Sequence, residues 1–333
     1  MNPIRRPPAG RAAARAAGPE HLARLAARLT DRDRWLLRML HEHRVLTTGQ
    51  VARIAFDGYR SAARRLLILY THRAVDRFRP YRPLGSAPWH YVLDTAGATV
   101  LAAEHGGTAA DLGYRHDRAL AIAHWSGLAH LVGVNDFFTA LTGAARASSG
   151  RAGLTAWWSE THCARLWGRH AHPDGYARWQ ADGAEIEFFL EYDTGTEPLH
   201  RVAGKLHGYA ALATATGITT PILFWLPSPR REAAFRTRAA ATRAGLADPD
   251  LVPVATATPS QTVGPNGPIW LPITHDAAGQ RAPRRALAGL ANSPPPQAEP
   301  RTETTISQCL RRHHRTSPPL AACGDTRTAT PAS

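Results

Sequence analysis

The stretch EIEFFLEYDTG, residues 185–195, alternates acidic and apolar side chains. The acidic positions are Glu185, Glu187, Glu191 and Asp193. The apolar positions between them are Ile186, Phe188, Leu190 and Tyr192. Successive side chains of a strand point to opposite faces, so this pattern predicts a β-strand with its apolar face in a core. The acidic face then needs water or a cation, since carboxylates gathered in a low dielectric do not all stay ionised.

Helical and strand patterns on both sides of this stretch predict an α/β layered domain over residues 115–274. A long helix is expected over residues 116–146 with a break at Gly133, and two further helices are expected over 197–214 and 228–245. Strands are expected at residues 153–160, 163–168, 175–180, 185–193, 220–227 and 251–257. The run TPILFWLP is apolar throughout and bounded by prolines, which is typical of a strand buried on both faces.

Residues 29–110 predict a smaller domain of three helices followed by two short strands. Thr30 is a good N-cap, with acidic residues in the turn that follows it. The third helix, within GYRSAARRLLILYTHRAV, is expected to turn Ala63, Leu66, Leu67 and Tyr70 inward. The strands are expected in VDRFRPY and WHYVLD, separated by a turn-rich segment. Three helices and a hairpin in this order resemble a winged helix-turn-helix.

In a winged helix-turn-helix the third helix enters the DNA major groove and the hairpin lies along the backbone. The candidate DNA-binding residues are Arg60, Arg64 and Arg65 on the helix and Arg77, Arg79 and Arg82 along the wing. The same arginines also fit the solvated face of a helical module that binds other proteins. Double-stranded DNA is the expected partner because the arginines cluster on the elements that such a motif uses.

The overall charge permits a polyanionic partner without proving one. The chain of 333 residues has a net charge of +14, and Lys205 is its sole lysine. An arginine bias of this kind also arises from a GC-rich genome. Three scattered cysteines and the lack of a long apolar run indicate a cytoplasmic protein without a membrane partner. Residues 1–28 are expected to be a basic flexible arm, and residues 275–333 a disordered tail rich in proline and arginine.

A second group of candidate site residues surrounds the acidic strand. Asp174 in HPDGY begins another expected strand, and it lies near Glu191 if the two strands form a hairpin. With Asp193, these carboxylates predict a site for Mg²⁺ or Mn²⁺. Lys205 and Tyr209 lie one turn apart on the following helix. Together these residues predict phosphodiester hydrolysis, in which Lys205 stabilises negative charge on the phosphate.

The histidines and the cysteine nearby are expected to have no part in this site. His124 and His130 fall on the long helix and are expected to be surface or packing residues. His162 and Cys163 are adjacent on an expected strand, where they face opposite ways and do not form a nucleophile–base pair.

These motifs carry a resemblance to known families. Asp174 in HPDGY and Glu191 in FFLEYD, on successive strands before a helix, resemble the metal-binding core of the PD-(D/E)xK nuclease superfamily. The wider pattern, from LTDRDRWLL to PILFWLP, resembles the replication-relaxation family of actinobacterial plasmid and mobile-element proteins. The resemblance implies an N-terminal winged helix-turn-helix followed by a restriction-endonuclease-like α/β domain. The sequence departs from the superfamily pattern at Asp193, two residues after Glu191, where a lysine is usual. Lys205 on the following helix would then take the place of that lysine.

Two functions follow from this resemblance and remain open at this level. One is a metal-dependent nuclease that cuts or nicks DNA during plasmid replication, relaxation or transfer. The other is a DNA-binding regulator or replication accessory built on an inactive nuclease scaffold. Either function implies association with the nucleoid or a plasmid, and replication or transfer proteins or a second copy of the chain are further candidate partners. A plain protein-interaction module is the weakest of the alternatives.

Overall fold

Residues 18–82, 84–273 and 283–291 are described by the computed structural model, and they fall into two units. The first unit runs to His124 and the second begins at Trp125, later than the expected boundary between residues 110 and 115. One cause of the shift is Tyr114, whose hydroxyl donates to the carbonyl of Leu93 at 3.1 Å and ties the connecting segment to the first unit. No helix in the described ranges is long and apolar enough to cross a membrane.

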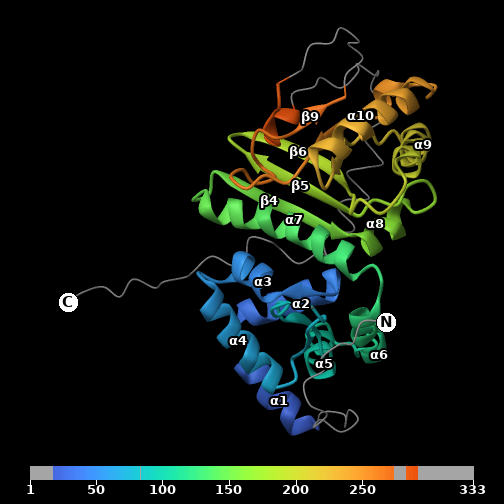
Figure 1. The fold of residues 1–333 in the computed structure, drawn as a ribbon. Coiled ribbons are helices and arrows are strands. Elements are labelled where there is room, and N and C mark those ends of the chain that lie inside the picture. The colour runs from blue at the N-terminus through green and yellow to red at the C-terminus, as the bar shows by residue number, and fades with distance from the viewer. Residues whose placement is uncertain (1–17, 83, 274–282, 292–333) are drawn as a thin grey trace. The chain divides into compact units, whose positions relative to one another are not determined.

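The first unit combines helices with a small three-stranded antiparallel sheet, ordered β1-β3-β2 (Figure 1). Its elements are α1 (Pro19–Arg28), α2 (Asp31–His43), β1 (Leu46–Thr47), α3 (Thr48–Ala55), α4 (Tyr59–Thr71), β2 (Val75–Phe78), β3 (His90–Leu93), α5 (Thr95–Ala103), α6 (His116–Ala121) and the 3₁₀ turn η1 (Ile122–His124). The expected order of three helices and a hairpin is present in α2, α3, α4 and the β2–β3 hairpin. Strand β1 was not anticipated from the sequence.

Local signals account for where these helices begin and which faces they bury. Thr30 caps α2 as expected, and its hydroxyl and the Asp33 side chain form a capping box. The expected inward face of α4 is partly wrong. Leu66 is buried, but the other buried positions are Ala62 and Leu69, and Leu67 is 48% exposed. The helix is therefore rotated relative to the sequence-based expectation, and its outer face carries apolar residues beside arginines.

The second unit is a mixed α+β structure around a six-stranded sheet. Its helices are α7 (Leu128–Ala147), α8 (Glu160–Trp167), α9 (Leu199–Thr216) and α10 (Pro229–Ala244), with the 3₁₀ turns η2 (Pro249–Leu251) and η3 (Ala288–Leu290). Its strands are β4 (Ala152–Ser159), β5 (Gly175–Ala181), β6 (Ala184–Tyr192), β7 (Ile222–Trp225), β8 (Val254–Ala257) and β9 (Leu271–Pro272).

The sheet has the order β4-β5-β6-β7-β8-β9. Strands β4, β5 and β6 are antiparallel, β6, β7 and β8 are parallel, and β9 is antiparallel to β8. Helix α7 lies along one face of the sheet, and α9 and α10 lie on the other (Figure 1). The antiparallel hairpin and the parallel strands meet at β6, which places the acidic strand in the middle of the sheet.

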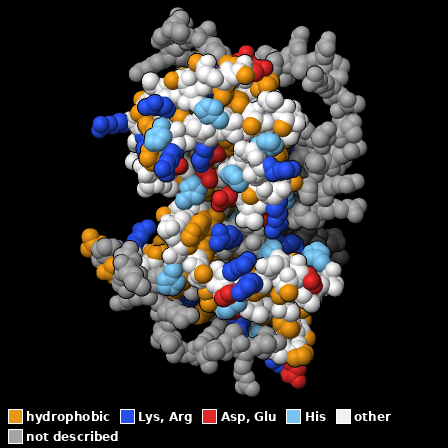
Figure 2. Space-filling view, turned by 90° about the vertical axis from the view of Figure 1, so that its right-hand side faces the viewer, with side chains coloured by type: hydrophobic (Ala, Val, Ile, Leu, Met, Phe, Trp, Pro, Cys, Tyr) orange, Lys and Arg blue, Asp and Glu red, His pale blue; other side chains and the backbone are white. Residues whose placement is uncertain are grey.

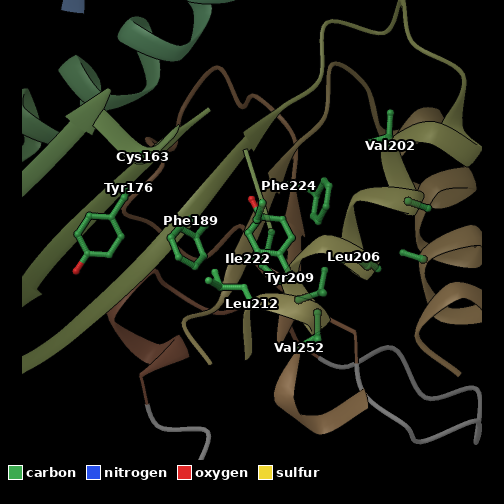
Figure 3. Close-up of a cluster of buried hydrophobic side chains, with 14 of the residues drawn as sticks. Cys163, Tyr176, Phe189, Val202, Leu206, Tyr209, Leu212, Ile222, Phe224 and Val252 are labelled. Carbon is green, nitrogen blue, oxygen red and sulfur yellow. The ribbon is translucent and has the colours of Figure 1, made fainter. Parts of the chain in front are cut away.

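Strand β6 is buried on both faces in its second half, whereas the sequence predicted one core face. Phe188 packs toward α7, with its ring 6.3 Å from that of Phe137. Phe189 points to the opposite face and packs against Tyr209 of α9, with ring centres 5.4 Å apart (Figure 3). The acidic column is therefore solvated at Glu185 and enters the core by Glu191, which is 2% exposed.

Two further expectations for the secondary structure of the second unit are wrong. Of the strand expected at residues 163–168, residues 163–167 lie instead in helix α8, which the Ser159 hydroxyl caps at its start and which ends at Gly168. Helix α7 continues through Gly133, and the break falls before it, near Gly127.

The expected disorder from residue 275 onward does not hold for residues 283–291. There Arg284 pairs with the buried Glu232, and Leu287 is fully buried. The expected arm over residues 1–17 and the tail from 292 lie outside the described residues, while residues 19–28 form α1.

Gly133 provides a test of the packing between α7 and β6. A Cβ at this position would lie 2.5 Å from the Tyr192 ring. Gly133→Ala is therefore expected to lower the free energy of unfolding by about 1–3 kcal/mol, although alanine favours a helix. Gly204 in α9 is the matched control, because a Cβ there meets nothing within 4 Å. Urea unfolding that shows Gly133→Ala as stable as Gly204→Ala would contradict the packing.

Candidate functional site

The β5–β6 hairpin brings two carboxylates to one end of the strand pair. Gly175 pairs with Leu190, so Asp174 lies just before β5 and beside Glu191 near the end of β6. The amide of Asp174 donates to the carbonyl of Leu190 at 3.0 Å. In return, the amide of Tyr192 donates to Oδ2 of Asp174 at 2.7 Å. The register therefore fixes the position of Asp174 by backbone contacts as well as by its side chain.

Helix α9 supplies two donors to Glu191. Nζ of Lys205 lies 2.5 Å from Oε2 of Glu191, and the hydroxyl of Tyr209 donates to Oε1 at 2.5 Å. The two donors are one helical turn apart and so reach the same carboxylate. We refer to Asp174, Glu191, Lys205 and Tyr209 as the carboxylate cluster. The structure places these four sequence-predicted residues together.

The charges in the carboxylate cluster are strongly perturbed. Burial raises the pKa of Glu191, the negative charge of Asp174 raises it further, and Lys205 and Tyr209 oppose the change. Burial opposes the charge on Lys205, but Glu191 and Asp174 raise the pKa of this ammonium above its ordinary value. Burial also raises the pKa of Tyr209, which keeps the phenol protonated as a donor.

The cluster opens to solvent on its basic side. Lys205 is 35% exposed at its side chain, whereas the carboxylate of Glu191 is buried. On the second unit, in the upper half of Figure 2, histidine and arginine or lysine side chains surround a small group of acidic ones. Because Lys205 is the exposed partner of the pair, an anionic ligand that approaches the cluster from solvent meets its ammonium before the buried carboxylate of Glu191.

His130 of α7 is a site residue that the sequence did not reveal. Its Nε2 lies 3.1 Å from Oδ1 of Asp174, so the second oxygen of that carboxylate also has a partner. Burial opposes its charge, but the contact with Asp174 raises the pKa of His130 above its ordinary value. The sequence expectation for His130 was a surface or packing role. His130 reaches Asp174 because this turn of α7 packs against Tyr192, with which His130 is in ring contact and against which Gly133 lies closely. The sequence of α7 gives no sign of that packing.

Asp193 does not join the carboxylate cluster. Arg231 of α10 binds both of its oxygens, and the amide of Gly195 donates to Oδ1 at 2.8 Å. Within the described ranges, no group of three or more histidine, cysteine, aspartate or glutamate side chains is arranged to hold a metal ion. The predicted metal ligands are therefore divided between two places, and Asp193 anchors the start of α10.

Asp174 and Glu191 nevertheless fit a magnesium-type site. Each of their oxygens has one donor, and a carboxylate oxygen has a second lone pair. Mg²⁺ commonly takes one or two carboxylates, with water and substrate phosphates completing its shell. The two carboxylates would hold the ion, and Lys205, which uses one of its three N–H donors on Glu191, would have others for a phosphate.

The predicted DNA-binding arginines fall into three groups. Arg60 and Arg64 are exposed on α4, and Arg82 is exposed between β2 and β3, and their side chains form no hydrogen bond or ion pair with another described residue. Arg77 and Arg79 lie over the ring of Trp89.

Arg65 forms the third group because it is held inside the first unit. It donates to both oxygens of the buried Asp33, with Nε 2.8 Å from Oδ1. This ion pair gives Arg65 a structural role inside the first unit.

Asp33 and Arg65 predict an acid-sensitive stability of the first unit. Burial opposes the charge on Asp33, but hydrogen bonds from Arg65 and Thr30 hold the pKa of Asp33 below its usual range. A carboxyl with a lowered folded pKa stabilises the fold above its unfolded pKa of about 3.9, and this stability is lost as the pH falls through the folded value. Arg65→Ala is expected to remove about 2 kcal/mol at neutral pH and much less near pH 2.

Urea unfolding measured over that pH range checks this prediction. Arg64→Ala is the control, since Arg64 is exposed on the same helix. An Arg65→Ala protein that loses as much stability on acidification as the wild type would show that another group controls the acid response.

The comparison with known families matches part of the chain. A family model described as replication-relaxation matches residues 37–223, more than half of the 333 residues. The match begins in α2 and ends in β7, so it includes α4, the β2–β3 hairpin and the carboxylate cluster. No curated protein and no solved structure matches the chain.

Proposed function

Because the chain belongs to the replication-relaxation family, we propose that it binds double-stranded DNA during plasmid replication or relaxation and cuts or nicks it. In this proposal the first unit is a winged helix-turn-helix that binds the duplex, and the second is a nuclease-like domain. The observation that carries the proposal is the convergence of Asp174, Glu191 and Lys205 in one cluster. Asp174 directly precedes β5, Glu191 lies on β6 and Lys205 on the following helix, an order that resembles PD-(D/E)xK nucleases except that the lysine stands on the helix.

The residues of the cluster have separate roles in this chemistry. Asp174 and Glu191 would hold Mg²⁺ or Mn²⁺. The ion would polarise the phosphate and activate a water molecule. Lys205 carries a positive charge that reaches the solvent, so it can stabilise negative charge on a phosphate. Tyr209 holds Oε1 of Glu191, and His130 holds Oδ1 of Asp174, so both carboxylates keep fixed orientations.

A second function, DNA binding without cleavage, is favoured by a different observation. Lys205 lies 2.5 Å from Oε2 of Glu191, close enough to balance its charge without a metal ion. In addition, the usual lysine position holds Asp193, which is bound to Arg231. A protein of this kind would use the first unit to bind its site and the second unit to bind replication or transfer proteins.

Supercoiled plasmid separates the two functions. Wild-type protein with Mg²⁺ or Mn²⁺ is expected to produce nicked circles, and Glu191→Gln and Lys205→Ala are each expected to slow nicking by roughly 100-fold or more. Glu185→Gln is the matched control, because Glu185 lies on the same strand but is exposed. Nicking that survives Glu191→Gln, or a wild-type protein that binds plasmid without nicking it, would remove the nuclease function and leave the second.

Duplex binding by α4 has its own test. Arg60→Ala combined with Arg64→Ala is expected to reduce the slope of log affinity against log salt by about 1.8, as expected for the loss of two phosphate contacts. Arg238→Ala is the control, because Arg238 is exposed on α10, outside the proposed DNA-binding unit. Fluorescence anisotropy with a labelled duplex measures the slope. Equal slopes for the double variant and the wild type would exclude α4 from the interface.

A further inference from the structure

Two arginines of the first unit are stacked on one tryptophan. Arg77 lies in β2 and Arg79 follows it, and both guanidinium carbons lie 4.1 Å from the ring centre of Trp89, which precedes β3. Arg77 also lies 4.3 Å from the ring centre of Tyr70 on α4. The stack therefore links the β2–β3 hairpin to α4.

These two arginines differ from the arginines that neutralise buried acids. Arg65, Arg231 and Arg284 each bind a buried carboxylate. Arg77 and Arg79 make no side-chain hydrogen bond or ion pair with any described residue, and their Nε atoms are buried without a partner. Their charges are thus held in place by aromatic rings rather than by acids.

Such an arrangement is suited to a phosphate ligand. A guanidinium that stacks on an aromatic face keeps its outer N–H groups free to bind oxygen. Stacking also removes rotamer freedom before any ligand arrives, so less entropy is lost on binding. Residues two apart on a strand share a face, and their Cα atoms are about 7 Å apart, so the two arginines present two guanidinium groups on one side of the hairpin to neighbouring phosphates.

We propose that Arg77 and Arg79 form a preorganised binding site for neighbouring phosphates of one DNA strand, with Trp89 as the residue that positions them. This inference rests on the proposed duplex binding by the first unit, and it adds a site and a positioning residue to it. Tyr70 extends the stack to α4, so the stack holds the two arginines at a fixed position relative to that helix.

Three variants measured with a short fluorescent duplex of mixed sequence test the inference. Arg77→Ala with Arg79→Ala is expected to lower the salt slope by about 1.8. Trp89→Leu is expected to weaken binding roughly tenfold with little change in slope, because the charges remain but are no longer held. The double variant Arg77→Lys, Arg79→Lys leaves Trp89 in place and is also expected to weaken binding roughly tenfold with little change in slope. Lysine keeps the positive charge but does not stack as a plane on the ring.

A double-mutant cycle separates positioning from a general effect on folding. Trp89→Leu is expected to change nothing further once Arg77 and Arg79 are alanine, and Trp89→Phe is expected to restore most of the affinity. A tenfold loss from Trp89→Leu that persists in the arginine-free background would overturn the inference, as would wild-type affinity of Trp89→Leu or of the double lysine variant. Absence of duplex binding by the wild type would instead overturn the proposed function itself.

Discussion

A carboxylate buried at the end of a central strand determines how the second unit is built. Removing Glu191 from water is unfavourable unless its oxygens are bonded, and Lys205 and Tyr209 of α9 supply both bonds. The rotation of α9 against the sheet is therefore fixed by the same contacts that form the cluster. Phe189 and Tyr209 pack beside them, so the candidate site is continuous with the core (Figure 3).

Two groups of described arginines have different physical roles. Arg65, Arg231 and Arg284 neutralise buried acids and contribute to stability, with little field left for a partner. Arg60 and Arg64 are exposed on α4, and Arg77 and Arg79 are stacked on Trp89, and the side chains of these four form no ion pair with a described acid. The net charge of +14 counts both kinds equally. Attraction of a polyanion depends more on the second kind, since no ion pair with a described acid cancels its charge.

Local patterns in the sequence predicted what local physics controls. Alternation identified β6, and the one-turn spacing of Lys205 and Tyr209 placed both on one face of α9. The helix at 160–167 was missed, although Ser159 as N-cap and Glu160 in the first turn were its signals. The partners of Asp174 and Asp193 could not be predicted. His130 and Arg231 come from helices distant in sequence, and only the packing of the sheet brings them close.

Residues 283–291 extend the second unit beyond the point where composition suggests that it stops. Arg284 supplies the guanidinium that neutralises Glu232, which is 3% exposed, and Arg285 pairs with Trp270 beside the edge strand β9. A chain shortened to residue 274 would keep every strand of the sheet yet leave that carboxylate buried without its cation. A fragment of this domain for isolated expression should therefore extend to residue 291 or later. A fragment that ends where the composition changes, near residue 274, would lack Arg284 and be destabilised.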